Sequence, residues 1–89
     1  MARLIINQSL RNALPEKALA AMNGVRTLEV EAVTVRGLLQ ELDQRYPGSR
    51  KSLEQGMAVA IDGDIHADAL LQPLAADSEV CFVPAIEGG

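Results

Sequence analysis

The residues with the clearest capacity for chemistry stand at the end of the chain, where Gly88 and Gly89 precede a free carboxyl group. Glycine permits positive φ angles and close approach of the backbone to another molecule. Because the pair has no turn to make, close approach is the better explanation. A partner can then enclose both residues and reach the carboxyl group without meeting a Cβ atom. The alternative is an end without a role, since chain termini are commonly disordered.

The segment before the two glycines gives this ending its context. Val80 to Val83 is a short apolar run rich in β-formers, which predicts a buried strand. Pro84 then ends the strand, because proline has no N–H to donate to a sheet. Two terminal glycines alone are a weak signal, and their position directly after a strand and a proline makes them more informative.

Few other residues have the types that catalysis or metal binding requires. Cys81 is the only cysteine, which excludes an internal disulfide and a cysteine-based metal cluster, and its apolar run predicts a small buried side chain. His66 lies near Asp62, Asp64 and Asp68, and a lone histidine among acidic loop residues is typical of a solvated surface. No Ser/His/Asp set, phosphate-binding glycine loop or paired-cysteine motif is present. We therefore expect no metal site, and no enzyme activity from this chain alone.

The composition indicates one folded domain and excludes several classes of partner. With 89 residues, of which 48% are hydrophobic, the chain can bury one modest core. A net charge of −4, no basic stripe and two aromatic residues argue against nucleic-acid binding. The apolar run in residues 1–6 is too short for a signal peptide, and no stretch approaches the roughly 20 apolar residues of a membrane span. We expect a cytoplasmic protein without a membrane association.

Four segments besides the last one have strand patterns. Arg3 to Asn7 is a continuous apolar run of the kind found in central strands. Arg26 to Ala32 alternates cleanly and predicts a strand with one face in water. Met57 to Ile61 predicts a third strand. The turn Asp62-Gly63-Asp64 separates it from a short return strand that begins at Ile65-His66.

Thr34 to Tyr46 has the clearest helix pattern. Thr34 is suited to the N-cap, and Pro47-Gly48 stops the helix. The apolar residues fall on one stripe at helical spacing, namely Val35, Leu38, Leu39, Leu42 and Tyr46. The polar residues off the stripe are expected to face solvent, namely Arg36, Glu41, Asp43, Gln44 and Arg45.

Three connections have weaker patterns. Within Gln8–Gly24, Pro15 can start a short helix that runs to Met22, and the alternative is an irregular loop. Ser49–Gly56 is a polar connection with a helical turn around Leu53. The segment from Ala67 to Asp77 is expected to form a loop whose leucines tuck under the sheet, namely Leu70, Leu71 and Leu74.

Together these elements predict an α+β fold. A single main helix packed on a mixed sheet of four to five strands, in this order, is the β-grasp arrangement, as in ubiquitin. In that arrangement the first two strands are antiparallel, and the last strand is central and parallel to the first. The domain is expected to span residues 1–86, followed by a flexible Gly-Gly tail over residues 87–89.

Three segments resemble the MoaD/ThiS family of ubiquitin-like sulfur-carrier proteins. Glu79–Gly89 is similar to the family ending, in which an acidic residue and Val lead through an apolar residue, Pro and an aliphatic residue to Gly-Gly. Val59–Asp64 resembles the strand and turn of the family, and Thr34–Leu39 resembles the start of its helix. The resemblance covers roughly Leu28–Gly89, whereas Gln8–Gly24 matches poorly.

The resemblance implies a mechanism centred on Gly89. An ATP-dependent adenylyltransferase of the ubiquitin-activating type would adenylate its carboxylate, and a sulfur donor would leave a thiocarboxylate. A second partner, such as a molybdopterin-synthase large subunit, would accept the sulfur for molybdopterin (molybdenum cofactor) or a related product. The chain would bind no cofactor itself, and its partner would use the ATP. The length favours the MoaD-like branch, although Ala85 stands where molybdopterin-synthase small subunits commonly have proline.

The resemblance also assigns residues that contact partners. Gly88 and Glu87 would enter the partner with Gly89. Pro84 and Ile86 would guide the tail into a groove, although Pro84 equally well simply ends the strand. Phe82 has two interpretations, a core residue or an anchor at the partner interface, because aromatic residues are enriched at binding hot spots.

Three competing functions follow. The first is the sulfur carrier, for molybdopterin or else for thiamine or cysteine biosynthesis. The second is a ubiquitin-like modifier that forms an isopeptide bond between Gly89 and a lysine of a target protein. The third is a β-grasp binding module with an inert tail. Both carrier functions require Gly89 to be the natural C-terminus.

Overall fold

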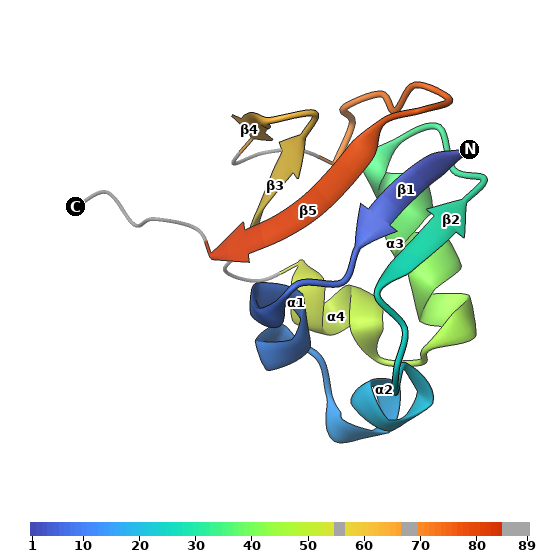
Figure 1. Cartoon of the computed structure of the whole chain (residues 1–89), viewed down its shortest axis with the longest axis vertical. Coiled ribbons are helices and arrows are strands. Elements are labelled where there is room, and N and C mark those ends of the chain that lie inside the picture. The colour runs from blue at the N-terminus through green and yellow to red at the C-terminus, as the bar shows by residue number, and fades with distance from the viewer. Residues whose placement is uncertain (55–56, 67–69, 85–89) are drawn as a thin grey trace.

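The structure is a computed structural model that describes residues 1–54, 57–66 and 70–84 (Figure 1). It has a five-stranded sheet of order β2-β1-β5-β3-β4. The strands are β1 (Ala2–Ile5), β2 (Thr27–Val30), β3 (Met57–Ile61), β4 (Asp64–His66) and β5 (Glu79–Pro84). The helices are α1 (Gln8–Ala13), α2 (Glu16–Ala21), α3 (Val35–Arg45) and α4 (Ser49–Leu53).

The last strand is central, as predicted. β5 pairs parallel with β1 on one side and antiparallel with β3 on the other. β1 and β2 are antiparallel, which confirms the predicted pairing of the first two strands. In Figure 1, α3 lies behind the sheet, while α1, α2 and α4 gather beyond one end of it. This is the predicted β-grasp fold, with α3 as its main helix.

The core forms between α3 and one face of the sheet. Leu4, Val80 and Ile61 stand side by side across β1, β5 and β3, and all three are buried. The helix contributes the predicted stripe, of which Val35, Leu38, Leu39 and Leu42 are buried, while Tyr46 is half-buried. Burying such side chains stabilises the fold by roughly 1.5–3 kcal/mol each. The apolar period of 3.6 residues thus sets the face of α3 that meets the sheet.

Thr34 is the N-cap of α3, as predicted. Its Oγ1 accepts a hydrogen bond from the backbone N–H of Gly37 at 3.1 Å. The two preceding orphan donors, on Val35 and Arg36, bond to backbone carbonyls of Gln72 and Leu70. Because the loop before β5 supplies these acceptors, the start of α3 is tied to that loop.

The loop before β5 differs from its prediction. Leu74 is buried, but Leu70 is 40% exposed and Leu71 is 81% exposed. The backbone of this segment runs beside the residues that precede α3, with a bridge between Thr34 and Pro73. That pairing directs Leu74 inward and leaves the two earlier leucines at the surface, so the prediction that all three tuck under the sheet was wrong.

The Gln8–Gly24 region forms two short helices, so its interpretation as an irregular loop was wrong. Pro15 is the N-cap of α2 and not its first helical residue. The chain leaves α2 through Gly24, whose φ of +83° is a conformation that other residues rarely adopt. The two helices pack into the core through a set of buried apolar residues, namely Leu10, Leu14, Ala18 and Met22.

The β3–β4 hairpin matches its prediction. Asp62 and Gly63 occupy positive φ, at +50° and +91°, as expected for the Asp-Gly turn. The carboxylate of Asp62 accepts the N–H of Glu79 at 2.9 Å, and its own N–H donates to the Glu79 carbonyl oxygen at 2.9 Å. The turn is therefore joined to the first residue of β5.

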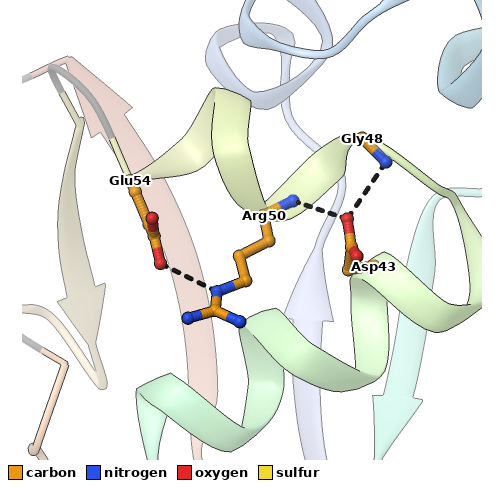
Figure 2. A network of polar contacts seen from close by, with 4 residues as sticks. All are labelled: Asp43, Gly48, Arg50 and Glu54. Carbon is orange, nitrogen blue, oxygen red and sulfur yellow. Dashed lines mark hydrogen bonds and ion pairs between the residues drawn. The ribbon is translucent and has the colours of Figure 1, made fainter.

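α4 is the helical turn predicted around Leu53, and it is capped by a residue of another helix. Its N-cap, Gly48, has a φ of +97° and no side chain to accept a bond. The carboxylate of Asp43, on α3, instead accepts the N–H groups of Gly48 at 3.0 Å and Arg50 at 3.2 Å (Figure 2). On the same helix, the Arg50 guanidinium pairs with Glu54 at 2.9 Å.

We expect Asp43→Ala to lower the free energy of unfolding by about 1 kcal/mol, because α4 loses its only side-chain cap among these contacts. Glu54→Ala removes an exposed ion pair and should cost less than about 0.5 kcal/mol. Urea titrations followed by circular dichroism measure both values. Equal costs for the two variants would contradict the capping role of Asp43.

Among the residues that the structure describes, no helix has the length and apolar character needed to cross a membrane.

Candidate functional site

The candidate site begins where β5 ends. β5 leads through Phe82 and Val83 to Pro84, its last residue, which is exposed. Ile86, Glu87, Gly88 and Gly89 lie outside the described residues. The structure therefore describes the strand that precedes the predicted carrier residue and the surroundings of its last residues.

Phe82 belongs to the core. Its side chain is 1% exposed and is the largest among the fully buried side chains. It stands opposite Val59 of β3, on the sheet face that meets α3. Of its two predicted roles, the structure thus supports the core role, and the prediction of a partner-contacting anchor was wrong for this side chain.

Cys81 differs from its prediction as a buried side chain. It is half-buried, because its side chain points to the sheet face opposite the core, where its neighbour across the pair with β3 is Ala60. It lines a shallow hollow with Ile5, Asp62 and Glu79. His66 is half-buried at the sheet edge on β4. Within residues 1–54, 57–66 and 70–84, no three His, Cys, Asp or Glu residues come together as a metal site would require.

The two sides of β5 are supported to different lengths. On one side, β3 pairs with it up to Pro84, which stands opposite Met57. On the other side, β1 pairs only through Leu4 and Val80. The last residues of β5 therefore extend past the end of β1, at the point where the chain turns from β1 into α1.

Asn7 occupies that point. Its Oδ1 accepts the N–H of Leu10 at 2.9 Å, which caps α1. Its Nδ2 donates to the carbonyl oxygen of Phe82 at 3.0 Å and approaches Cys81 Sγ at 3.5 Å. One amide therefore joins the start of α1 to the end of β5. In Figure 1, α1 accordingly lies beside the end of β5.

Pro84 fits this geometry. Backbone groups two residues apart in a strand point to the same side. The nitrogen of Pro84 therefore points, like the Phe82 carbonyl, to the side where β1 has ended. Proline loses no sheet hydrogen bond at this position, which explains how it can belong to a central strand.

Sequence reasoning missed Asn7. Asparagine directly before a helix is a recognised N-cap signal, and it would have found the bond to Leu10. The bond to Phe82 joins residues 75 positions apart, so no local pattern indicates it.

Comparisons with known proteins agree with the fold. The model of the ThiS family matches residues 5–89. The CysO structure from Mycobacterium tuberculosis is 13% identical, with a TM-score of 0.71 over 97% of this chain and 100% of that chain. SAMP1 from Methanosarcina acetivorans, a small archaeal modifier protein, is 21% identical, with a TM-score of 0.67 over 99% of this chain and 95% of that chain.

A chain in the crystal structure of the Amycolatopsis orientalis BexX/CysO complex is 16% identical, with a TM-score of 0.74 over 100% of both chains. No curated protein sequence matches this chain. At these identities the solved structures show the common fold, and the predicted closeness to the MoaD-like branch stays a prediction. Because the family model matches nearly the entire chain and the fold is the β-grasp, this protein belongs to the ThiS family of ubiquitin-like sulfur carriers.

Proposed function

We propose that this protein carries sulfur as a thiocarboxylate on Gly89 and delivers it in the biosynthesis of molybdopterin or a related sulfur-containing metabolite. The observation that carries the proposal is the Gly-Gly ending, which follows directly from the central strand of a ThiS-family fold. β5 is bonded along β3 up to Pro84 and by Asn7 at Phe82. Such support gives the segment that follows a defined starting point.

The proposed reaction has two steps. In the first, a carboxylate oxygen of Gly89 attacks the α-phosphorus of ATP, and pyrophosphate leaves with the broken P–O bond. In the second, a sulfide or persulfide sulfur attacks the acyl carbon. The C–O bond to AMP then breaks, and the terminal carboxylate has exchanged one oxygen for sulfur. Adenylation is needed because a carboxylate is a poor acyl donor.

The chain itself supplies a positioned acyl group, and its partners supply the chemistry. Gly88 and Gly89 have no Cβ, so the acyl carbon can enter a crowded site. The proposed partners are an ATP-dependent adenylyltransferase of the ubiquitin-activating type and a sulfur-acceptor enzyme, such as a molybdopterin-synthase large subunit. That a similarly folded CysO was crystallised in a complex with BexX supports a carrier that works bound to other proteins. Thiamine and cysteine biosynthesis are the alternative destinations of the sulfur.

A second candidate function is a protein modifier. The structural similarity to SAMP1, named a modifier protein, favours it. Here the adenylated Gly89 would form an isopeptide bond with a target lysine, and AMP would leave. This function predicts ladders of higher-mass conjugates in cells, whereas the sulfur carrier predicts none.

Intact-mass spectrometry tests the proposal directly. The purified protein is incubated with a candidate activating enzyme, ATP and a sulfide source. We expect a mass gain equal to the exchange of one oxygen for one sulfur atom. An unchanged mass, with an activating enzyme shown to be active on its own carrier, would contradict the pairing with that enzyme. Unchanged masses across enzymes from all three pathways would favour the modifier or an inert tail.

A further inference from the structure

The end of β5 depends on Asn7 for its support on the β1 side. β1 pairs with β5 only through Leu4 and Val80. Beyond that pair, the carbonyl oxygen of Phe82 accepts the Asn7 Nδ2 at 3.0 Å. This hydrogen bond lies two residues before Pro84, so it is placed to restrain the last residues of the strand.

The two bonds of Asn7 require an amide side chain. The oxygen must accept from Leu10 N–H at the start of α1, and the nitrogen must donate to Phe82. Aspartate and serine can accept the first bond as N-caps. An ionised carboxylate has no proton to donate, and the serine side chain is one atom shorter, which places its hydroxyl short of the Phe82 carbonyl. The cap of α1 and the hold on β5 can therefore be separated by mutation.

We propose that Asn7 is a positioning residue for the carrier reaction. It restrains the end of β5, from which the segment that carries Gly89 departs, in the direction that the activating enzyme receives. This inference rests on the proposed function. Gly89 lies five residues beyond Pro84, so a change in the direction of the strand end is passed to the carboxylate through a short stretch of chain.

The proposal predicts a specific kinetic change. When the strand end samples more directions, fewer of them suit the enzyme, and ordering them on binding costs free energy. This cost weakens the complex and raises KM for the carrier protein. The acyl carbon itself is unchanged, so kcat for adenylation stays the same once the chain is bound.

Two variants and one control test the hold of Asn7 on β5. Asn7→Asp and Asn7→Ser keep the cap of α1 and remove the donor to Phe82. The control, Thr34→Ala, removes the N-cap of α3 and leaves β5 untouched. Amide hydrogen exchange is compared between Val83, at the end of β5, and Leu42, a core residue of α3. The ratio of the two rates reports local opening of β5 separately from global stability.

We expect the ratio of Val83 to Leu42 exchange to rise about fivefold in both Asn7 variants, as for the loss of one hydrogen bond. It should not rise in Thr34→Ala. The KM for adenylation, measured by pyrophosphate exchange, should rise by a similar factor of about five in the Asn7 variants, with kcat unchanged. Thr34→Ala should leave both constants as they are.

An unchanged exchange ratio overturns the proposal, and so does an unchanged KM in variants whose ratio has risen. A fall in kcat without a rise in KM also overturns it, because that result indicates damage to the chemical step. If the wild-type protein itself is not adenylated, the proposed function fails together with the kinetic part of this inference. The exchange ratio then still supports or overturns the hold of Asn7 on β5.

Discussion

Deletion of Gly89 is expected to abolish thiocarboxylate formation and to leave the stability of the domain unchanged. The deletion removes the carboxylate position that the activating enzyme would adenylate. The buried core ends in sequence at Phe82, and glycine has no side chain to bury. We therefore expect a change of less than about 0.5 kcal/mol in the free energy of unfolding. Intact-mass spectrometry measures the first effect and urea titration the second.

Gly89→Ala is the matched variant for this deletion. It keeps the chain length and the terminal carboxylate and adds one methyl group at the reacting residue. We expect adenylation to slow by about 10- to 100-fold, as for a misplaced reacting group. Normal thiocarboxylate formation at the end of the Gly89-deleted chain would contradict the role of Gly89. Equal rates for Gly89→Ala and the wild type would show that close approach is not the reason for glycine at this position.

Truncation of Phe82 is expected to have the largest effect on stability. The side chain is 1% exposed, stands opposite Val59 and lies in the core of a small domain. Phe82→Ala should lower the free energy of unfolding by about 3–5 kcal/mol. Domains of this kind have about 5–15 kcal/mol in total, so the variant should be marginally folded. Urea titration followed by circular dichroism gives the value.

Phe82→Leu separates the core role from a partner-binding role. Leucine keeps an apolar side chain in the core, so we expect a cost of about 1–2 kcal/mol and a folded domain. Because the Phe82 ring is buried, the kcat/KM of adenylation should be unchanged in this variant. A loss of kcat/KM above tenfold in the folded Phe82→Leu protein would instead assign the ring a contact with the partner.

Periodic patterns in the sequence predicted α3 and three of the strands. Val35, Leu38 and Leu42 repeat at helical spacing, and all are buried where the stripe predicts. Thr34 is the cap, as a hydroxyl before such a stripe indicates. The Asp62-Gly63 turn also needs only local information, because its positive φ angles favour these residue types. In these elements one local pattern and the tertiary contacts point to the same structure.

The orientation of β5 was beyond reach of the same reasoning. Val80 to Val83 is an unbroken apolar run, so it contains no alternation to show which side chains face the core. Pairing with β1 and β3 decides that Val80 and Phe82 face α3, while Cys81 faces the other way. For this reason Cys81 was wrongly predicted to be buried, and Phe82 kept two open roles.

What the sequence by itself determined is the β-grasp arrangement, its main helix and the ending that carries the proposed chemistry. Each depends on local periodicity, turn residues or a motif. Only the tertiary structure decided how α1 and α2 join the core, which face each β5 residue takes, and that Asn7 bonds to Phe82. The physical reason is that these features depend on contacts between residues far apart in the chain, and the geometry of such contacts exists only once the sheet has assembled.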